Sequence, residues 1–75
     1  MVTSTKIDMV RTGQHINQLR IDAGMSVRDI QTILGLGSTQ AIYKWLAGKG
    51  LPNIDNLVVL SAILKVSLDD LIVRC

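Results

Sequence analysis

The stretch from Ser26 to Gly48 constrains the fold of this chain more than any other feature. Its residues, S-V-R-D-I-Q-T-I-L-G-L-G-S-T-Q-A-I-Y-K-W-L-A-G, predict two short helices joined by a turn with two glycines. Ser26 and Asp29 form a short capping box at the start of the first helix, which Gly35 ends. The second helix is expected over 38–47, with a serine as its cap and the last glycine as its stop.

Three further helices are expected around this pair. Cap residues and helix-spaced apolar residues predict them over 8–23, over 54–64 and from Ser67 onward. Nothing in the sequence indicates a strand. The predicted fold class is therefore all-α, a compact five-helix bundle.

Length and composition limit the chain to one small core. Its 75 residues, 48% of them apolar, predict a single domain over 8–75. The first residues are polar and lack periodicity, so we expect a flexible arm over 1–7. No apolar run reaches the ~20 residues that a membrane span needs. No signal-peptide pattern is present, and the one cysteine cannot form an internal disulfide. We expect a cytoplasmic protein with no membrane partner.

The charge is weakly basic and unevenly distributed. The net charge is +2; residues 1–50 carry six Lys or Arg against three Asp, and residues 51–75 carry two against three. The basic part contains the two-helix unit, which fits a polyanionic partner. On charge alone, an ordinary solvated surface fits about as well.

The helix expected over 38–47 has one apolar side and one polar side when its residues are placed at 100° intervals. Ile42 and Trp45 belong to the apolar side, which must pack in the core. Thr39 lies between the two sides near the helix start. The outward side carries Gln40, Tyr43, Lys44 and Ala47.

This outward row suits the major groove of DNA. Gln40 can bond N7 and N6 of adenine, Lys44 can donate to guanine or to phosphate, and Thr39 can bond a base edge or pack on thymine. Tyr43 can donate to a phosphate or stack on a sugar. For an isolated helix, an ordinary solvated face is an equally good interpretation.

The segments around this row form a combination typical of one protein family. In order along the chain they are I-N-Q-L-R-I-D-A-G-M-S, D-I-Q-T-I-L-G, A-I-Y-K-W-L-A-G-K, L-P-N-I-D-N-L-V-V-L-S and V-S-L-D-D-L-I. Together they resemble the Cro/repressor-type (XRE) helix-turn-helix family over about four-fifths of the chain, Thr12 to Ile72. The resemblance implies a lambda-repressor-like five-helix domain with the helix-turn-helix at helices 2 and 3. It also implies a third helix that enters the major groove, usually as a two-fold dimer on a near-palindromic operator.

Carried over position by position, the resemblance assigns base reading to Thr39, Gln40 and Lys44. Ser38 and Tyr43 would make further contacts in the groove. The implied phosphate contacts lie at helix starts, which present unpaired N–H groups to an anion, and in the turn after the third helix. They are Arg11, Gln14, Ser26, Arg28, Lys49 and Asn53.

The helix-turn-helix itself departs from the family pattern. The G-L-G turn before Ser38 is one residue longer than usual, which affects how the reading helix docks. Gln31 replaces an alanine and needs partners for its amide if it is buried. Val27 replaces a phosphate-binding glutamine, so Arg28 takes that role.

Two further departures concern single side chains. Arg20 matches an arginine whose usual acidic partner is replaced here by Leu46, so it must reach Asp22, another acid or the DNA. Lys65 stands at the usual glycine stop of the fourth helix, where a positive φ would strain it.

The helix over 54–64 is apolar on two sides. Val59, Ala62 and Ile63 lie roughly opposite the stripe that contains Leu60 and Leu64. The second side can lie under the fifth helix and the C-terminal tail or pair with another subunit. We expect a homodimer contact at Val59 and Ile63, because a palindromic site benefits from two copies.

These observations predict a sequence-specific DNA-binding transcriptional regulator, a repressor from a bacterium or mobile element. The alternative is a protein-interaction module that keeps the fold and holds a partner through Val59 and Ile63. An enzyme is not expected, because the sequence has no paired carboxylates and no nucleophile with a base. The sequence has no cluster of metal-ligating residues and no second domain that would sense a ligand, so we expect no metal, no cofactor and no small-molecule ligand. His15 is expected on the surface.

Overall fold

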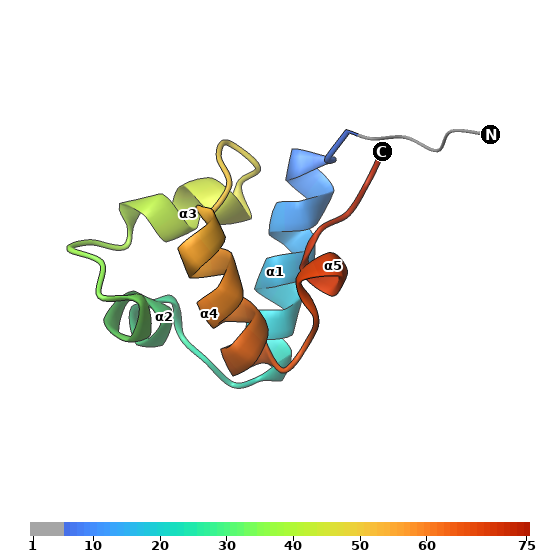
Figure 1. Ribbon diagram of the computed structural model, residues 1–75. Coiled ribbons are helices and arrows are strands. Elements are labelled where there is room, and N and C mark those ends of the chain that lie inside the picture. Colours follow the sequence, from blue (N-terminus) through green and yellow to red (C-terminus); the bar gives the residue numbers. More distant parts are fainter. Residues whose placement is uncertain (1–5) are drawn as a thin grey trace.

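The computed structural model describes residues 6–75, and helices make up its fold (Figure 1). They are α1 (Met9–Asp22), α2 (Val27–Leu34), α3 (Gln40–Leu46), α4 (Ile54–Leu64) and α5 (Leu68–Leu71). Within the described residues there is no strand, but an isolated antiparallel bridge joins Ile7 and Arg74. The all-α, five-helix prediction is confirmed. None of the described helices is long and apolar enough to cross a membrane.

Side-chain caps determine where four of the helices begin. At the start of α2, the Ser26 hydroxyl accepts the Asp29 N–H at 3.0 Å and the Asp29 carboxylate accepts the Ser26 N–H at 2.9 Å. This reciprocal capping box was predicted. Single caps of the same kind, each worth about 1 kcal/mol, begin α1 at Asp8, α4 at Asn53 and α5 at Ser67.

The start of α3 differs from the prediction. The helix was expected from Ser38, but its first residue is Gln40, and Thr39 stands at the N-cap with no side-chain hydrogen bond. The Ser38 hydroxyl still accepts the Gln40 N–H, at a long 3.4 Å. Thr39 already has a helical conformation (φ −87°, ψ −5°). Ser38, one residue before this N-cap, therefore contacts the first helical N–H, that of Gln40.

The core draws on every helix. Its buried apolar residues are aliphatic apart from one tryptophan: Ile16, Ile30, Ile42, Trp45, Leu60, Leu64 and Leu71. Trp45 packs in the core as predicted. The helices α1 and α3 come especially close at Gly13. A Cβ atom built there would lie 2.7 Å from the Leu46 carbonyl oxygen and closer still to that of Trp45. The backbone contact holds α3 against α1 and turns its other side outward.

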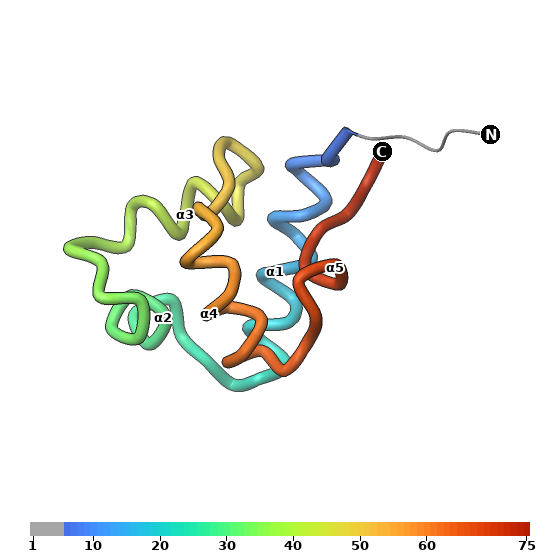
Figure 2. The backbone as a smooth tube through the Cα atoms, in the orientation of Figure 1, coloured from blue at the N-terminus to red at the C-terminus, as the bar shows by residue number. Residues whose placement is uncertain are grey.

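The two ends of the described chain lie side by side (Figure 2). The Cys75 N–H donates to the Lys6 carbonyl at 3.1 Å, next to the bridge between Ile7 and Arg74. Residues 1–5 of the expected arm lie outside the described residues. The remaining two residues of that arm are held to the C-terminal segment by these backbone contacts.

The second apolar side expected on α4 is only partly covered in the structure. Ile63 packs against the core and Val59 is half-buried, whereas Ile54 is 72% and Val58 49% exposed. Of the residues expected on the second apolar side, Ala62 is exposed and the other two are partly covered, so the dimer contact at Val59 and Ile63 stays a prediction.

Candidate nucleic-acid interface

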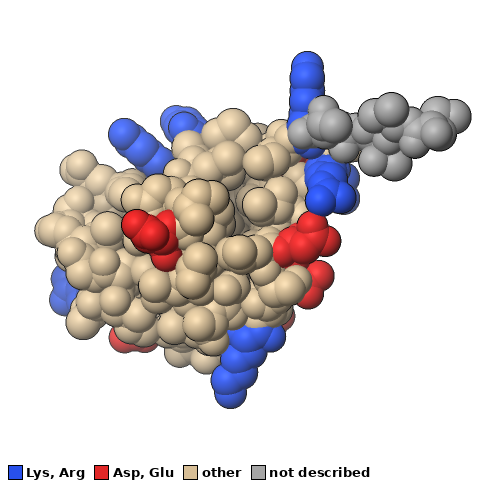
Figure 3. Space-filling view, viewed as in Figure 1, with Lys and Arg blue, Asp and Glu red and all other residues tan. Residues whose placement is uncertain are grey.

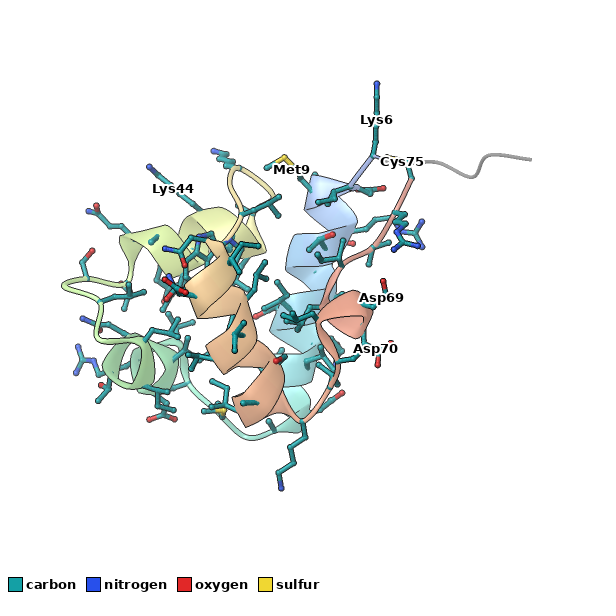
Figure 4. All side chains as sticks on the ribbon, in the orientation of Figure 1. Lys6, Met9, Lys44, Asp69, Asp70 and Cys75 are labelled. Carbon is teal, nitrogen blue, oxygen red and sulfur yellow. The ribbon has the colours of Figure 1, made fainter. Side chains whose placement is uncertain are left out.

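The polar row of α3 faces outward as predicted. Gln40, Tyr43, Lys44 and Ala47 are all exposed, while Ile42 on the opposite side is buried. The Lys44 side chain points away from the body of the molecule (Figure 4). Thr39, at the edge of the row, is half-buried. The four exposed side chains line a shallow, open depression of about 400 Å³ together with Lys49.

The turn after α3 brings Lys49 to this depression. The Lys49 N–H donates to the Lys44 carbonyl at 2.9 Å, which folds the chain back over the helix end. Gly48 makes this reversal with φ at +75°, and a Cβ atom on it would lie 2.6 Å from Val10 Cα. A glycine is required here both by the backbone conformation and by the close approach to α1. The depression is therefore lined by two lysines, Lys44 in the outward row and Lys49 next to it.

A second hollow, of about 690 Å³, separates α3 from the start of α2 and the second half of α1. Tyr43 borders both hollows and is 57% exposed, so its hydroxyl can serve either. The second hollow, which we call the α2–α3 cleft, is lined by Asn17, Arg20, Ser26, Val27, Arg28, Thr39, Tyr43 and Leu46.

Arg20 is held in the α2–α3 cleft by polar groups that carry no charge. Its Nε and Nη2 donate to Asn17 Oδ1 at 3.1 and 2.8 Å, and its Nη1 donates to the Met25 carbonyl at 2.8 Å. Of the partners expected for Arg20, no acidic side chain pairs with it within residues 6–75, since Asp22 accepts instead from Gln18 Nε2 at 2.9 Å. Arg20 thereby ties α1 to the turn before α2 while its charge stays uncompensated beside the cleft. The alternative contact of Arg20 with DNA stays a prediction.

Asn17 is a site residue that the sequence interpretation missed. It lies three residues before Arg20 on α1, a spacing at which helical side chains meet. Once Arg20 was seen to lack its usual acid, that spacing could have identified the partner.

The start of α2 opens into the same cleft. Ser26 and Arg28 are both exposed there, and the amides of the first helical turn have no acceptor within the helix. The positive end of the helix dipole favours an anion at this place. Asp29 lies in the same turn, but its carboxylate accepts the Ser26 N–H. Arg28 is thus the side chain at this helix start that can approach a phosphate.

Hydrogen bonds organise the unusual turn between α2 and α3. The Leu36 N–H donates to the Gln31 carbonyl at 3.0 Å, and Gln31 Nε2 donates back to the Leu36 carbonyl at 3.2 Å. Gly35 occupies the left-handed region with φ at +68°, as the predicted helix stop requires. Leu36 packs against the core. The half-buried Gln31 therefore has the partner its amide needs, and the turn is anchored at both ends.

Three of the expected phosphate-binding residues line neither hollow. Arg11, Gln14 and Asn53 are exposed, and Asn53 Oδ1 is already used to cap α4 by accepting from Asn56. In Figure 3, basic side chains project from the edge of the molecule near α3, while the middle of the same face, over α4, is mostly uncharged. The expected site residues thus divide into a set gathered around α3 and the start of α2, and a set outside both hollows.

Other chemistry has little support in the described part of the chain. Residues 6–75 contain no group of three His, Cys, Asp or Glu side chains placed to hold a metal ion. His15 is partly exposed, and its Nε2 lies 2.7 Å from the Asp70 carbonyl oxygen, where it fastens α5 to α1.

Comparisons with known proteins agree with this geometry. The sequence profile described as Helix-turn-helix matches residues 16–71. The fold is similar to the restriction-modification controller protein C.AhdI from Aeromonas hydrophila, with a TM-score of 0.74 and 23% identity over 85% of this chain and 96% of that one. It is also similar to the DNA-binding domain of BldD, with a TM-score of 0.69 and 15% identity over 87% of this chain and 93% of that one. No curated protein sequence matches the chain significantly.

Proposed function

This chain belongs to the Helix-turn-helix family of the Cro/repressor (XRE) type, whose members are DNA-binding transcription regulators, and we propose that it is a repressor that reads a near-palindromic operator through α3. The observation that carries the proposal is the outward row of α3. A helix of seven residues buries Ile42 and Trp45 on one side and presents hydrogen-bonding side chains, Lys44 among them, on the other side next to Lys49. These groups match the donors and acceptors that base pairs expose in the major groove.

In this proposal α3 supplies the base contacts. Thr39, Gln40 and Lys44 read base edges, with Ser38 and Tyr43 as further groove contacts. The exposed amide of Gln40 at the start of the helix supports its role, because the N-terminal residues of a recognition helix reach the base edges.

The α2–α3 cleft would hold the DNA backbone. Ser26 and Arg28 border it at the positive end of α2, and Tyr43 joins it to the base-reading row. Lys49 would take a phosphate on the other side of that row. Phosphate contacts of this kind fix the register of the protein on the duplex and carry no sequence information themselves. Arg11, Gln14 and Asn53 are proposed as outer phosphate contacts.

The alternative is a protein-interaction module that keeps the fold without specific DNA binding. One observation favours it, which is the exposure of the apolar residues Ile54 and Val58 on α4. Titration of a labelled random duplex at low salt separates the two functions. A DNA-binding regulator binds random sequence weakly, and its affinity falls as salt rises. No binding at the lowest salt would favour the interaction module.

Charge-matched variants make this titration specific to α3. Lys44→Ala removes one positive charge from the row, and Arg74→Ala removes one from the C-terminal segment, whose last residue lies across the molecule from Lys44 (Figure 4). We expect weaker binding for Lys44→Ala and nearly unchanged binding for Arg74→Ala. Equal losses from both variants would indicate attraction by net charge alone and would count against the proposed interface.

A further inference from the structure

Ala47 has the smallest side chain in the outward row of α3. It is exposed at the end of the helix, and its N–H donates to the Tyr43 carbonyl at 3.0 Å, so it lies one turn after Tyr43. Lys44 lies three residues before it, and helical side chains at spacings of three and four residues are neighbours. The Ala47 methyl group therefore lies beside the side chains of Tyr43 and Lys44.

The short side chain of Ala47 leaves a hollow beside it. Long side chains on a helix point back toward its N-terminus, so a long residue at this position would cover the surface over Tyr43 and Lys44. Alanine leaves that surface open, and the shallow depression of about 400 Å³ lies there, with Gln40 and Lys49 also lining it. The exposed lining is mostly carbon. Apolar surface therefore lies within a row that otherwise carries hydrogen-bonding groups.

Apolar surface next to a hydrogen-bond donor matches one base edge in the major groove. Thymine presents a methyl group at C5 beside the O4 acceptor. Cytosine presents an amino donor at N4, and neither purine carries a methyl group there. An alanine methyl group can pack on the thymine methyl group while a neighbouring lysine ammonium group donates to O4. 5-Methylcytosine has the methyl group, but its N4 amino group and a lysine ammonium group are both donors.

We propose that Ala47 and Tyr43 form a subsite for the 5-methyl group of one thymine in each half-site, and that Lys44 favours thymine by donating to O4. The inference rests on the proposed function of α3 as the reading helix. Ala47 is then a specificity-determining residue in addition to Thr39, Gln40 and Lys44. Transfer of one methyl group out of water corresponds to about a fourfold gain in affinity.

Replacement of thymine by uracil tests the subsite, because uracil lacks only the methyl group. An operator is first selected from a randomised duplex pool, and each of its thymines is then replaced singly by uracil. The parent should lose about fourfold in affinity at one thymine position in each half-site, measured by fluorescence anisotropy. At that position, 5-methylcytosine paired with guanine should bind more tightly than cytosine but more weakly than thymine.

Two matched variants link this effect to Ala47. Ala47→Gly removes the side-chain methyl group, and replacement of the sensitive thymine by uracil should then change affinity by less than about twofold. Ala23→Gly is the control, because Ala23 is also an exposed helix C-cap residue, with φ −81° and ψ −4° against φ −84° and ψ −5° at Ala47. It lies at the end of α1, so this variant should keep the full effect of about fourfold. Urea unfolding checks that both variants fold.

The outcomes separate this inference from the proposed function. If an operator is selected but none of its thymines is sensitive to uracil, the subsite is absent, while α3 still reads DNA through other contacts. If the uracil effect is the same in Ala47→Gly as in the parent, another residue receives the methyl group. Tighter binding of 5-methylcytosine than of thymine would exclude the preference for thymine. If no operator is selected, the proposed function and the subsite fail together.

Discussion

Gly13 in α1 and Trp45 in α3 meet through backbone atoms. A Cβ atom at Gly13 would overlap the carbonyl oxygen of Trp45 and lie 2.7 Å from that of Leu46. The side of α3 that carries Trp45 is thereby pressed onto α1, and the polar row on its other side is held at the surface. The position of the proposed reading helix therefore depends on a glycine, which has no side chain, at position 13.

Gly13→Ala tests this dependence. Helix propensity alone would make alanine about 1 kcal/mol more favourable than glycine inside α1. The overlap with rigid backbone should outweigh that gain and destabilise the protein by about 1–3 kcal/mol, measured by urea unfolding. Gly37→Ala is the control, because a Cβ atom there meets nothing within 4 Å. If the Gly13 variant is as stable as the parent, the close contact between α1 and α3 is wrong.

Thr12→Val tests the long-range contact at the C-terminus. The buried Thr12 hydroxyl accepts the Val73 N–H at 3.0 Å and donates to the Val73 carbonyl at 3.3 Å. Valine keeps the shape but leaves a part-buried amide without its partner, which should cost about 1–3 kcal/mol. Hydrogen exchange at Val73 should also accelerate. Thr32→Val, at an exposed position with a bond only to its own helix, should change stability far less.

Arg20→Lys tests the fork that joins α1 to the turn before α2. Lysine cannot donate simultaneously to Asn17 and to the Met25 carbonyl in the geometry of a guanidinium. We expect a loss of about 1–2 kcal/mol in thermal or urea unfolding. Arg74→Lys alters an exposed ion pair with Asp69 and should be nearly neutral. Equal effects for the two variants would mean that the Arg20 contacts contribute nothing specific.

The helix boundaries were largely predictable from sequence because local chemistry decides them. Ser26 and Asp29 cap α2 reciprocally, Asn53 caps α4 and Gly35 ends α2, and each acts within three or four residues. Lys65 takes the left-handed conformation expected of the position where the family usually has glycine, with φ at +59°. The split of α3 into a packed and an exposed side followed from its periodicity and is confirmed.

Features that depend on tertiary contacts were not predictable in the same way. The packing of Ile63 against the core depends on how α4 is oriented on the other helices. A helical wheel that is apolar on both sides cannot show which side faces the core. The partner of Thr12 lies 61 residues away in sequence, at Val73. The residues that contact DNA stay predictions, because they depend on a molecule that is not part of the structure.

Arg28→Ala tests the proposed phosphate site at the start of α2. The logarithm of the binding constant should fall linearly with the logarithm of salt concentration, with a slope of about −0.9 per phosphate neutralised. Removing Arg28 should weaken binding about equally on operator and random duplex and reduce the steepness of the slope by about one. A loss confined to the operator would instead assign Arg28 to base reading.

Selection of binding sites from a randomised duplex pool, run with the parent and with Gln40→Ala, tests the central claim most directly. We expect the parent to enrich a near-palindromic motif. We expect Gln40→Ala to lose base preference at one position in each half-site, worth about 1–3 kcal/mol per bidentate contact. Gln18→Ala, on α1, should select the same motif as the parent. An unenriched pool, or a motif unchanged by Gln40→Ala, would contradict recognition of DNA through the outward row of α3.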